Sequence, residues 1–110
     1  MTIAVVARDR ESSAEIPGEF ALHQNYPNPF NPTTLVSFEL PVASGVRLEV
    51  FNVLGERVAT LVDGELPPGS HALTFDAARL SSGVYFTVMR ARGTANGEEF
   101  RATGRMLLTK

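Results

Sequence analysis

Residues 35–50 read Leu-Val-Ser-Phe-Glu-Leu-Pro-Val-Ala-Ser-Gly-Val-Arg-Leu-Glu-Val, and two stretches of this segment alternate strictly between apolar and polar side chains. Val36 and Phe38 belong to the first stretch, and Val46 and Leu48 belong to the second. Successive side chains of a β-strand point to opposite faces, so a period of 2 indicates a strand with one buried face. The segment therefore predicts two half-buried strands.

The alternation continues almost to the last residue and is interrupted by turn signals. Asn52-Val53-Leu54-Gly55, Pro67-Pro68-Gly69 and Asn96-Gly97 predict turns, because glycine, proline and asparagine favour turn backbone conformations. Five further strands are predicted at residues 20–22, 56–63, 71–76, 84–89 and 98–110. The strand at residues 84–89 has apolar side chains on both faces, which predicts a central position in its sheet.

Two smaller features of the pattern give further expectations. Val58 and Leu61 lie three residues apart, which breaks the period of 2 and predicts a β-bulge near Ala59 and Thr60. Residues 77–82 form a short connection that has room for one helical turn.

Seven short strands in 110 residues are typical of an all-β, immunoglobulin-like antiparallel sandwich. The hydrophobic content of 44% is enough for a packed core and contradicts disorder. Residues 20–110 are expected to form this domain. Residues 1–19 are mostly polar and have no period, so we interpret them as a linker or as the end of an upstream domain.

Composition excludes several classes of function. The chain has no cysteine, which excludes disulfides, thiolate metal sites and cysteine nucleophiles. No apolar run approaches the roughly 20 residues of a membrane span. The formal net charge of −2 offers no overall field that would attract nucleic acid or an anionic membrane. The sequence also lacks the glycine-rich and nucleophile-elbow motifs of nucleotide-binding proteins and hydrolases.

The titratable residues show no spacing that predicts catalysis. His23 and His71 lie far apart and lack the helical spacing of a zinc site. Glu98 and Glu99 are adjacent on a predicted strand, so their side chains point to opposite faces. No calcium-loop motif is present. These observations predict a protein without enzymatic activity, cofactor or metal.

A carbohydrate-binding or cell-adhesion domain, retained on a secreted enzyme, is the alternative function. Such domains hold sugar rings on exposed aromatic side chains, but this chain has no tryptophan and only two tyrosines, Tyr26 and Tyr85. Tyr85 lies in the predicted central strand, where a core tyrosine with its hydroxyl bonded at a strand corner is expected. Tyr26 lies in a proline-rich stretch.

Basic residues gather toward the C-terminal end. Residues 90–110 contain five basic and two acidic side chains, a balance of +3, whereas residues 1–89 contain five basic and ten acidic, a balance of −5. Two interpretations stay open: a solvated edge hairpin whose charges discourage strand addition, or a docking face for a receptor. Lys110 is the only lysine.

Five motifs occur in a fixed order and carry a family resemblance. The first is the proline-rich run at residues 25–34, which includes Pro27, Asn28, Pro29, Phe30, Asn31 and Pro32. The others are Val46-x-Leu48-x-Val50 with Asn52-x-x-Gly55 and Val58, Gly69-x-His71, Leu80-Ser81-Ser82-Gly83-Val84-Tyr85, and Arg105-Met106-Leu107-Leu108-Thr109-Lys110.

Together these motifs resemble the C-terminal sorting domain of type IX secretion over residues 20–110. The first and fourth motifs also resemble the immunoglobulin-like domain of flagellar hook-capping proteins, which implies the same fold. The given sequence stops directly after the last motif, as the tail of the sorting family does, and this favours the sorting interpretation.

The resemblance implies a non-catalytic signal domain of a larger secreted bacterial protein. Its cargo would pass through the periplasm, cross the outer membrane and be released or attached to the cell surface. The implied partners are the type IX outer-membrane translocon, a sortase-type surface protease and the covalently linked upstream cargo. The protease would cut within residues 8–18, a polar segment suited to proteolysis.

The resemblance further implies contacts between the translocon and residues of the last motifs, namely Gly83, Tyr85, Arg105, Met106, Leu107, Leu108 and Lys110. We expect the final strand to form an exposed edge. Its backbone groups would bind by strand addition, and its side chains would give selectivity.

Overall fold

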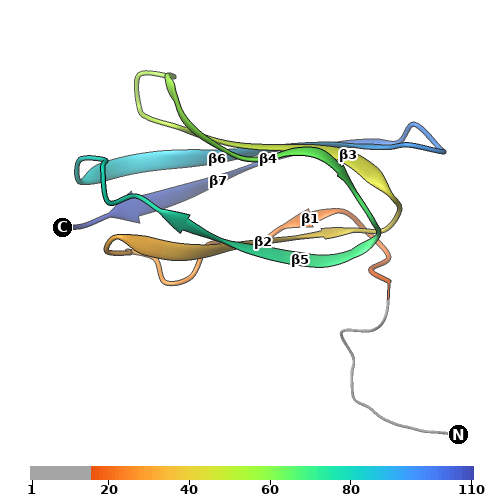
Figure 1. The fold of residues 1–110 in the computed structure, drawn as a ribbon, viewed down its shortest axis with the longest axis horizontal. Helices are drawn as coiled ribbons and strands as arrows, with labels where there is room; N and C mark the ends of the chain where they lie inside the picture. Colours follow the sequence, from red (N-terminus) through yellow and green to blue (C-terminus); the bar gives the residue numbers. More distant parts are fainter. Residues whose placement is uncertain (1–15) are drawn as a thin grey trace, which may run out of the picture.

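A computed structural model describes residues 16–110 as two antiparallel β-sheets packed face to face (Figure 1). The seven strands are β1 (Ala21–Leu22), β2 (Thr33–Leu40), β3 (Ser44–Phe51), β4 (Arg57–Leu66), β5 (Gly69–Asp76), β6 (Gly83–Gly93) and β7 (Glu99–Leu108). One sheet has the order β1-β2-β5 and the other has the order β4-β3-β6-β7. The predicted all-β sandwich is confirmed.

The strand order is that of an immunoglobulin-like domain in which the fourth strand has joined the second sheet. In immunoglobulin nomenclature β1, β2 and β5 correspond to strands A, B and E, and β3, β6 and β7 correspond to C, F and G. In constant-type domains the fourth strand pairs with E, whereas here β4 pairs with β3. β6 lies between β3 and β7, as its apolar sequence predicted.

The core lies between the sheets and follows from the period of 2. Phe38 and Leu40 of β2 face Leu48 of β3, and all three are at most 1% exposed. Met89 of β6 and Met106 of β7 complete the opposite wall. The alternate residues of β3, β6 and β7 point to the outer face of the four-stranded sheet. In β6 this face is charged and exposed at Arg90 and Arg92 but apolar and half-buried at Phe86 and Val88.

β4 pairs with β3 irregularly. The register shifts once between Leu48 and Glu49 and again between Val50 and Phe51, which leaves Leu61 and Val58 as the extra residues of β4. The predicted β-bulge is therefore present, and a second one accompanies it. Both extra side chains remain partly buried against the core.

Two of the predicted turns use glycine in the left-handed region, where other residues are strained. Gly55 has a φ of 83° in the β3–β4 turn, and Gly97 has a φ of 70° in the β6–β7 turn. In the first turn the Asn52 side chain accepts hydrogen bonds from the backbone nitrogens of Leu54 and Glu56, at 2.9 and 3.0 Å. Asparagine closes the turn through its own side chain, as such turns require.

The helical turn allowed for residues 77–82 is not formed. Within the connection one backbone hydrogen bond forms, from Leu80 N to Ala77 O at 3.0 Å, while Ala77 N donates outward to Pro32 O at 2.9 Å. No helix forms in these residues. The Asp76 side chain accepts the Ala78 backbone N–H at 2.9 Å and so replaces a helical bond with a local one.

Tyr85 connects this loop to the core. Its ring is 7% exposed, and its hydroxyl donates a hydrogen bond to the Ser81 carbonyl four residues upstream, at 2.7 Å. A tyrosine near the start of strand F that bonds an upstream backbone group is the tyrosine corner of immunoglobulin-like sandwiches. The predicted core position and bonded hydroxyl of Tyr85 are both confirmed.

The tyrosine corner leads to the first testable prediction. Tyr85→Phe keeps the ring and removes the hydroxyl, which leaves the Ser81 carbonyl without its partner. We expect a loss of about 1 kcal/mol of unfolding free energy, equivalent to a fall in Tm of about 4–8 °C for a domain of this size. Thermal unfolding followed by circular dichroism measures it. Tyr26→Phe, at a ring that is 79% exposed, is the matched control. An unchanged Tm in Tyr85→Phe would refute the stabilising role of the corner.

Candidate recognition surface

The proline-rich run at residues 25–34 lies beside the end of β7. Phe30 N donates to Leu107 O at 2.9 Å, and Thr109 N donates to Phe30 O at 3.0 Å. These bonds form a short parallel bridge between Phe30 and Leu108. Figure 1 shows the loop before β2 and the C-terminus at the same end of the sandwich. The first and last family motifs, about 80 residues apart in the chain, therefore form one structural unit.

Two side-chain amides extend this contact. Asn28 Oδ1 accepts the Leu107 backbone N–H at 2.9 Å, and Gln24 Nε2 donates to Arg105 O at 2.9 Å. Three backbone groups on this edge of β7 are thus already bonded: Arg105 O, Leu107 N and Leu107 O. An added strand would have to displace the proline-rich run here. The expectation that the last residues offer their backbone for strand addition is corrected, because another part of the same chain occupies that edge.

The proline-rich run is fixed from within by a buried polar cluster. Asn25 is 5% exposed, and its Nδ2 donates to Thr34 Oγ1 at 3.0 Å and to Pro27 O at 3.2 Å. Thr34 Oγ1 in turn donates to Pro27 O at 2.8 Å. Phe30 is 2% exposed and packs near Phe75, with ring centroids 6.2 Å apart. Sequence reasoning missed this cluster; its signal was an asparagine and a threonine at the two ends of the run.

The expected recognition residues separate into core and surface. Tyr85, Met106 and Leu108 are 7%, 1% and 0% exposed and face the sandwich interior. Gly83 is half-buried opposite Leu108. The solvent-facing residues of the set are Arg105, Leu107 and Lys110. In the proline-rich run, Phe30 is buried and Pro32 is half-buried, while Pro27, Asn28, Pro29 and Asn31 are exposed.

The last residue is attached to the loop before β6. Lys110 N donates to Ser82 Oγ at 3.0 Å, and Lys110 Nζ donates to Ala78 O. The chain end is therefore held in place by the Ser-Ser-Gly stretch of the fourth motif.

A shallow depression of about 350 Å³ marks where the two segments meet. It is lined by Gln24, Asn28 and Pro29 on one side and by Arg105, Met106 and Leu107 on the other. We call the exposed members of this set, Gln24, Asn28, Pro29, Arg105 and Leu107, the terminal surface. It offers amide groups, one cation and an apolar side chain that is 39% exposed, a composition suited to binding a protein.

The histidines have structural partners. His23 Nε2 lies 2.7 Å from Glu39 Oε2, and His71 Nε2 lies 2.9 Å from Pro67 O while its ring stacks on Phe38. Residues 16–110 contain no group of three metal-ligating side chains. In the same residues no helix has the length and apolar character to cross a membrane.

Comparison with known proteins identifies the family of this small sandwich domain. The family model of the secretion system C-terminal sorting domain matches residues 24–98. The chain belongs to this family, whose members are sorting domains of type IX secretion. No curated protein matched the chain.

Among solved structures, the chain is similar to part of PorZ from Porphyromonas gingivalis, described as an essential bacterial surface component of the type IX secretion system. The two are 14% identical, with a TM-score of 0.46. The match covers 81% of this chain but 11% of the PorZ chain.

Proposed function

We propose that this domain directs the export of a larger bacterial protein across the outer membrane by type IX secretion, and its attachment to the cell surface. Membership of the sorting-domain family supports the export role. The observation that carries the proposed site is the set of hydrogen bonds between the proline-rich run and residues 105–109. The signal is then a composite surface of the folded domain and not a linear peptide.

The proposed partners act at different parts of the chain. The outer-membrane translocon contacts the terminal surface through Arg105 and Leu107, after the cargo has crossed the periplasm. The sortase-type protease cuts in residues 8–18, most of which lie outside the described residues. The division into residues 1–19 and residues 20–110 likewise stays a prediction.

The structure does not favour the carbohydrate-binding alternative. A sugar platform requires exposed aromatic rings, and Tyr85 is in the core. Tyr26 is exposed, but no other tyrosine or tryptophan accompanies it.

The test is an export assay with a matched pair of variants. Residues 8–110 are fused to a periplasmic reporter in a bacterium with the type IX system, and reporter is measured in the medium and surface fractions. We expect Arg105→Gln with Leu107→Gln to reduce export about tenfold or more, which corresponds to about 1.4 kcal/mol of lost binding. The control is Arg79→Gln with Leu54→Gln, which makes the same chemical changes at two other exposed residues.

Both double variants should unfold at the wild-type temperature, because all four side chains face solvent. Equal export of the two variants would contradict a role for the terminal surface. Export that does not depend on a working translocon would contradict the sorting function itself.

A further inference from the structure

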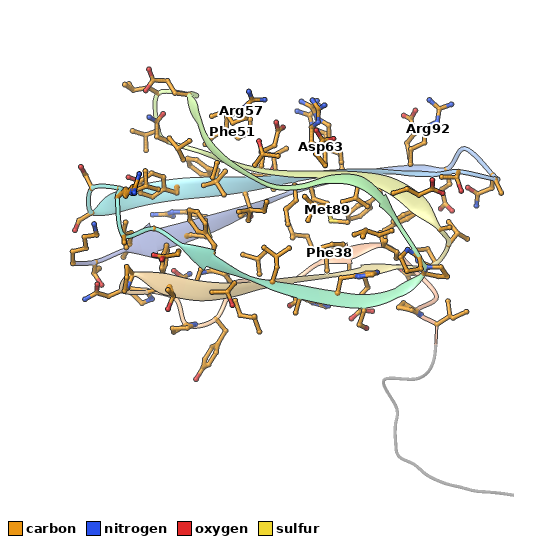
Figure 2. The ribbon with its side chains drawn as sticks, viewed as in Figure 1. Phe38, Phe51, Arg57, Asp63, Met89 and Arg92 are labelled. Atoms are coloured by element: carbon orange, nitrogen blue, oxygen red, sulfur yellow. The ribbon has the colours of Figure 1, made fainter. Side chains whose placement is uncertain are left out.

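The outer face of the four-stranded sheet carries three arginines in one cross-strand row. Arg47 of β3 lies opposite Arg90 of β6, and Arg90 lies opposite Arg101 of β7. Asp63 of β4 lies opposite Arg47 at the far end of the row. Figure 2 shows Asp63 and the neighbouring Arg92 on the side of this sheet that faces away from Met89 and the core. We call Arg47, Arg90 and Arg101 the arginine row.

The row is only partly neutralised by the rest of the described domain. Arg47 lies 3.8 Å from Asp63, and Arg92 lies 3.5 Å from Glu99. Within residues 16–110, neither Arg90 nor Arg101 makes an ion pair. Adjacent strands are only about 4.8 Å apart, and like charges directly opposite each other destabilise a sheet. Ion pairs among the described residues thus offset the charge of Arg47 but not that of Arg90 or Arg101.

The row borders a depression. Arg47, Arg90, Arg92 and Arg101 line a shallow hollow of about 500 Å³, with Asp63 and Glu99 also at its rim. Gly45 lies in the next cross-strand row, opposite Arg92, and its missing side chain leaves open space there. Four guanidinium groups and two carboxylates give this hollow a charge of +2, although the chain as a whole carries −2.

We propose that this hollow binds a doubly charged oxyanion, a phosphate or sulfate group. The planar guanidinium fork donates paired hydrogen bonds to such oxygens, and a dianion matches the charge of +2. Arg90 is the central ligand, because it lies between Arg47 and Arg101 in the row. The site is separate from the terminal surface and does not depend on the proposed export function.

The first experiment titrates the full chain with inorganic phosphate at constant ionic strength and follows backbone amide chemical shifts. We expect saturable shifts at Gly45, Arg47 and Arg90. Arg90→Gln should weaken binding about fivefold or more, equivalent to about 1 kcal/mol. Arg79→Gln changes the net charge equally in an exposed loop and should bind phosphate as the wild type does. Unsaturable shifts, or equal weakening in both variants, would overturn the proposal.

A second readout separates the site from general charge effects. In phosphate-free buffer Arg90→Gln should raise Tm, because it relieves repulsion within the row. Phosphate should raise the Tm of the wild type by mass action but not that of Arg90→Gln. A wild-type Tm that does not respond to phosphate would overturn the proposal.

The source of the oxyanion is resolved with vesicles of phosphatidylcholine, prepared with and without phosphatidic acid. Sedimentation with the phosphatidic acid vesicles that is lost in Arg90→Gln would support the site and assign it to a lipid headgroup. Phosphate binding without sedimentation would support the site and assign it to a free or soluble phosphate. Absence of both would refute it.

Discussion

Deletion of residues 106–110 is expected to unfold the domain and thereby abolish export. The deletion removes Met106 and Leu108, which are 1% and 0% exposed. Truncation of such a buried side chain to alanine alone costs about 2–5 kcal/mol. The deletion also removes the Leu107 and Thr109 bonds to Phe30. Together these losses approach the whole stability of a small domain, about 5–15 kcal/mol.

The measurement combines far-ultraviolet circular dichroism of the purified domain with the export assay. We expect the truncated protein to lose its β-sheet signal and its cooperative unfolding transition. The Arg105→Gln with Leu107→Gln variant should lose export while it keeps both. A truncated domain that remains folded but is not exported would show that the last five residues act as a linear signal. A truncated domain that remains folded and is exported would contradict both the folding role and the export role of these residues.

Phe30→Ala is expected to be among the most destabilising single substitutions in the domain. The Phe30 ring is 2% exposed within the core cluster, and its backbone joins the proline-rich run to the C-terminal strand. Removal of a buried phenylalanine ring costs about 3–5 kcal/mol, which lowers the Tm of a domain of this size by about 12 °C or more. Tyr26→Ala, in the same run but 79% exposed, should change stability by less than about 0.5 kcal/mol.

Hydrogen exchange distinguishes global loss of stability from release of the run. Relative to the wild type, Phe30→Ala should accelerate exchange of the Thr109 amide much more than exchange of the central amides of β3 and β6. The reason is that the acceptor of the Thr109 amide is the Phe30 carbonyl. Uniform acceleration across the sandwich would contradict local release and leave Phe30 with a packing role alone.

The separation of core from surface also changes how the family motifs are understood. Of the last motif, Met106 and Leu108 close the sandwich, whereas Arg105 and Leu107 face solvent. The buried positions of the motif serve folding, whereas the proposed contact with a partner involves only its solvent-facing positions. A substitution in it tests recognition only at the solvent-facing positions.

The strands and most turns could be predicted from the sequence because their causes are local. Alternation places Val36 and Phe38 on one face whatever the rest of the chain does, and Asn52 to Gly55 forms its turn with its own side chain and a left-handed glycine. The buried hydroxyl of Tyr85 was predictable for the same reason, since its partner lies four residues away. The connection at residues 77–82 was harder to predict, because Ala77 N bonds the distant Pro32 O while the Asp76 side chain takes the Ala78 amide.

The candidate surface was beyond the reach of the sequence because its partners are about 80 residues apart. No local pattern states that Asn28 accepts the Leu107 amide. The arginine row depends likewise on the register of three strands, which brings Arg47 beside Arg90 and Arg101. Sequence determined which residues form strands, turns and core, through periodicity and turn chemistry. Tertiary packing alone decided which strand edges are already occupied and which charges are placed together.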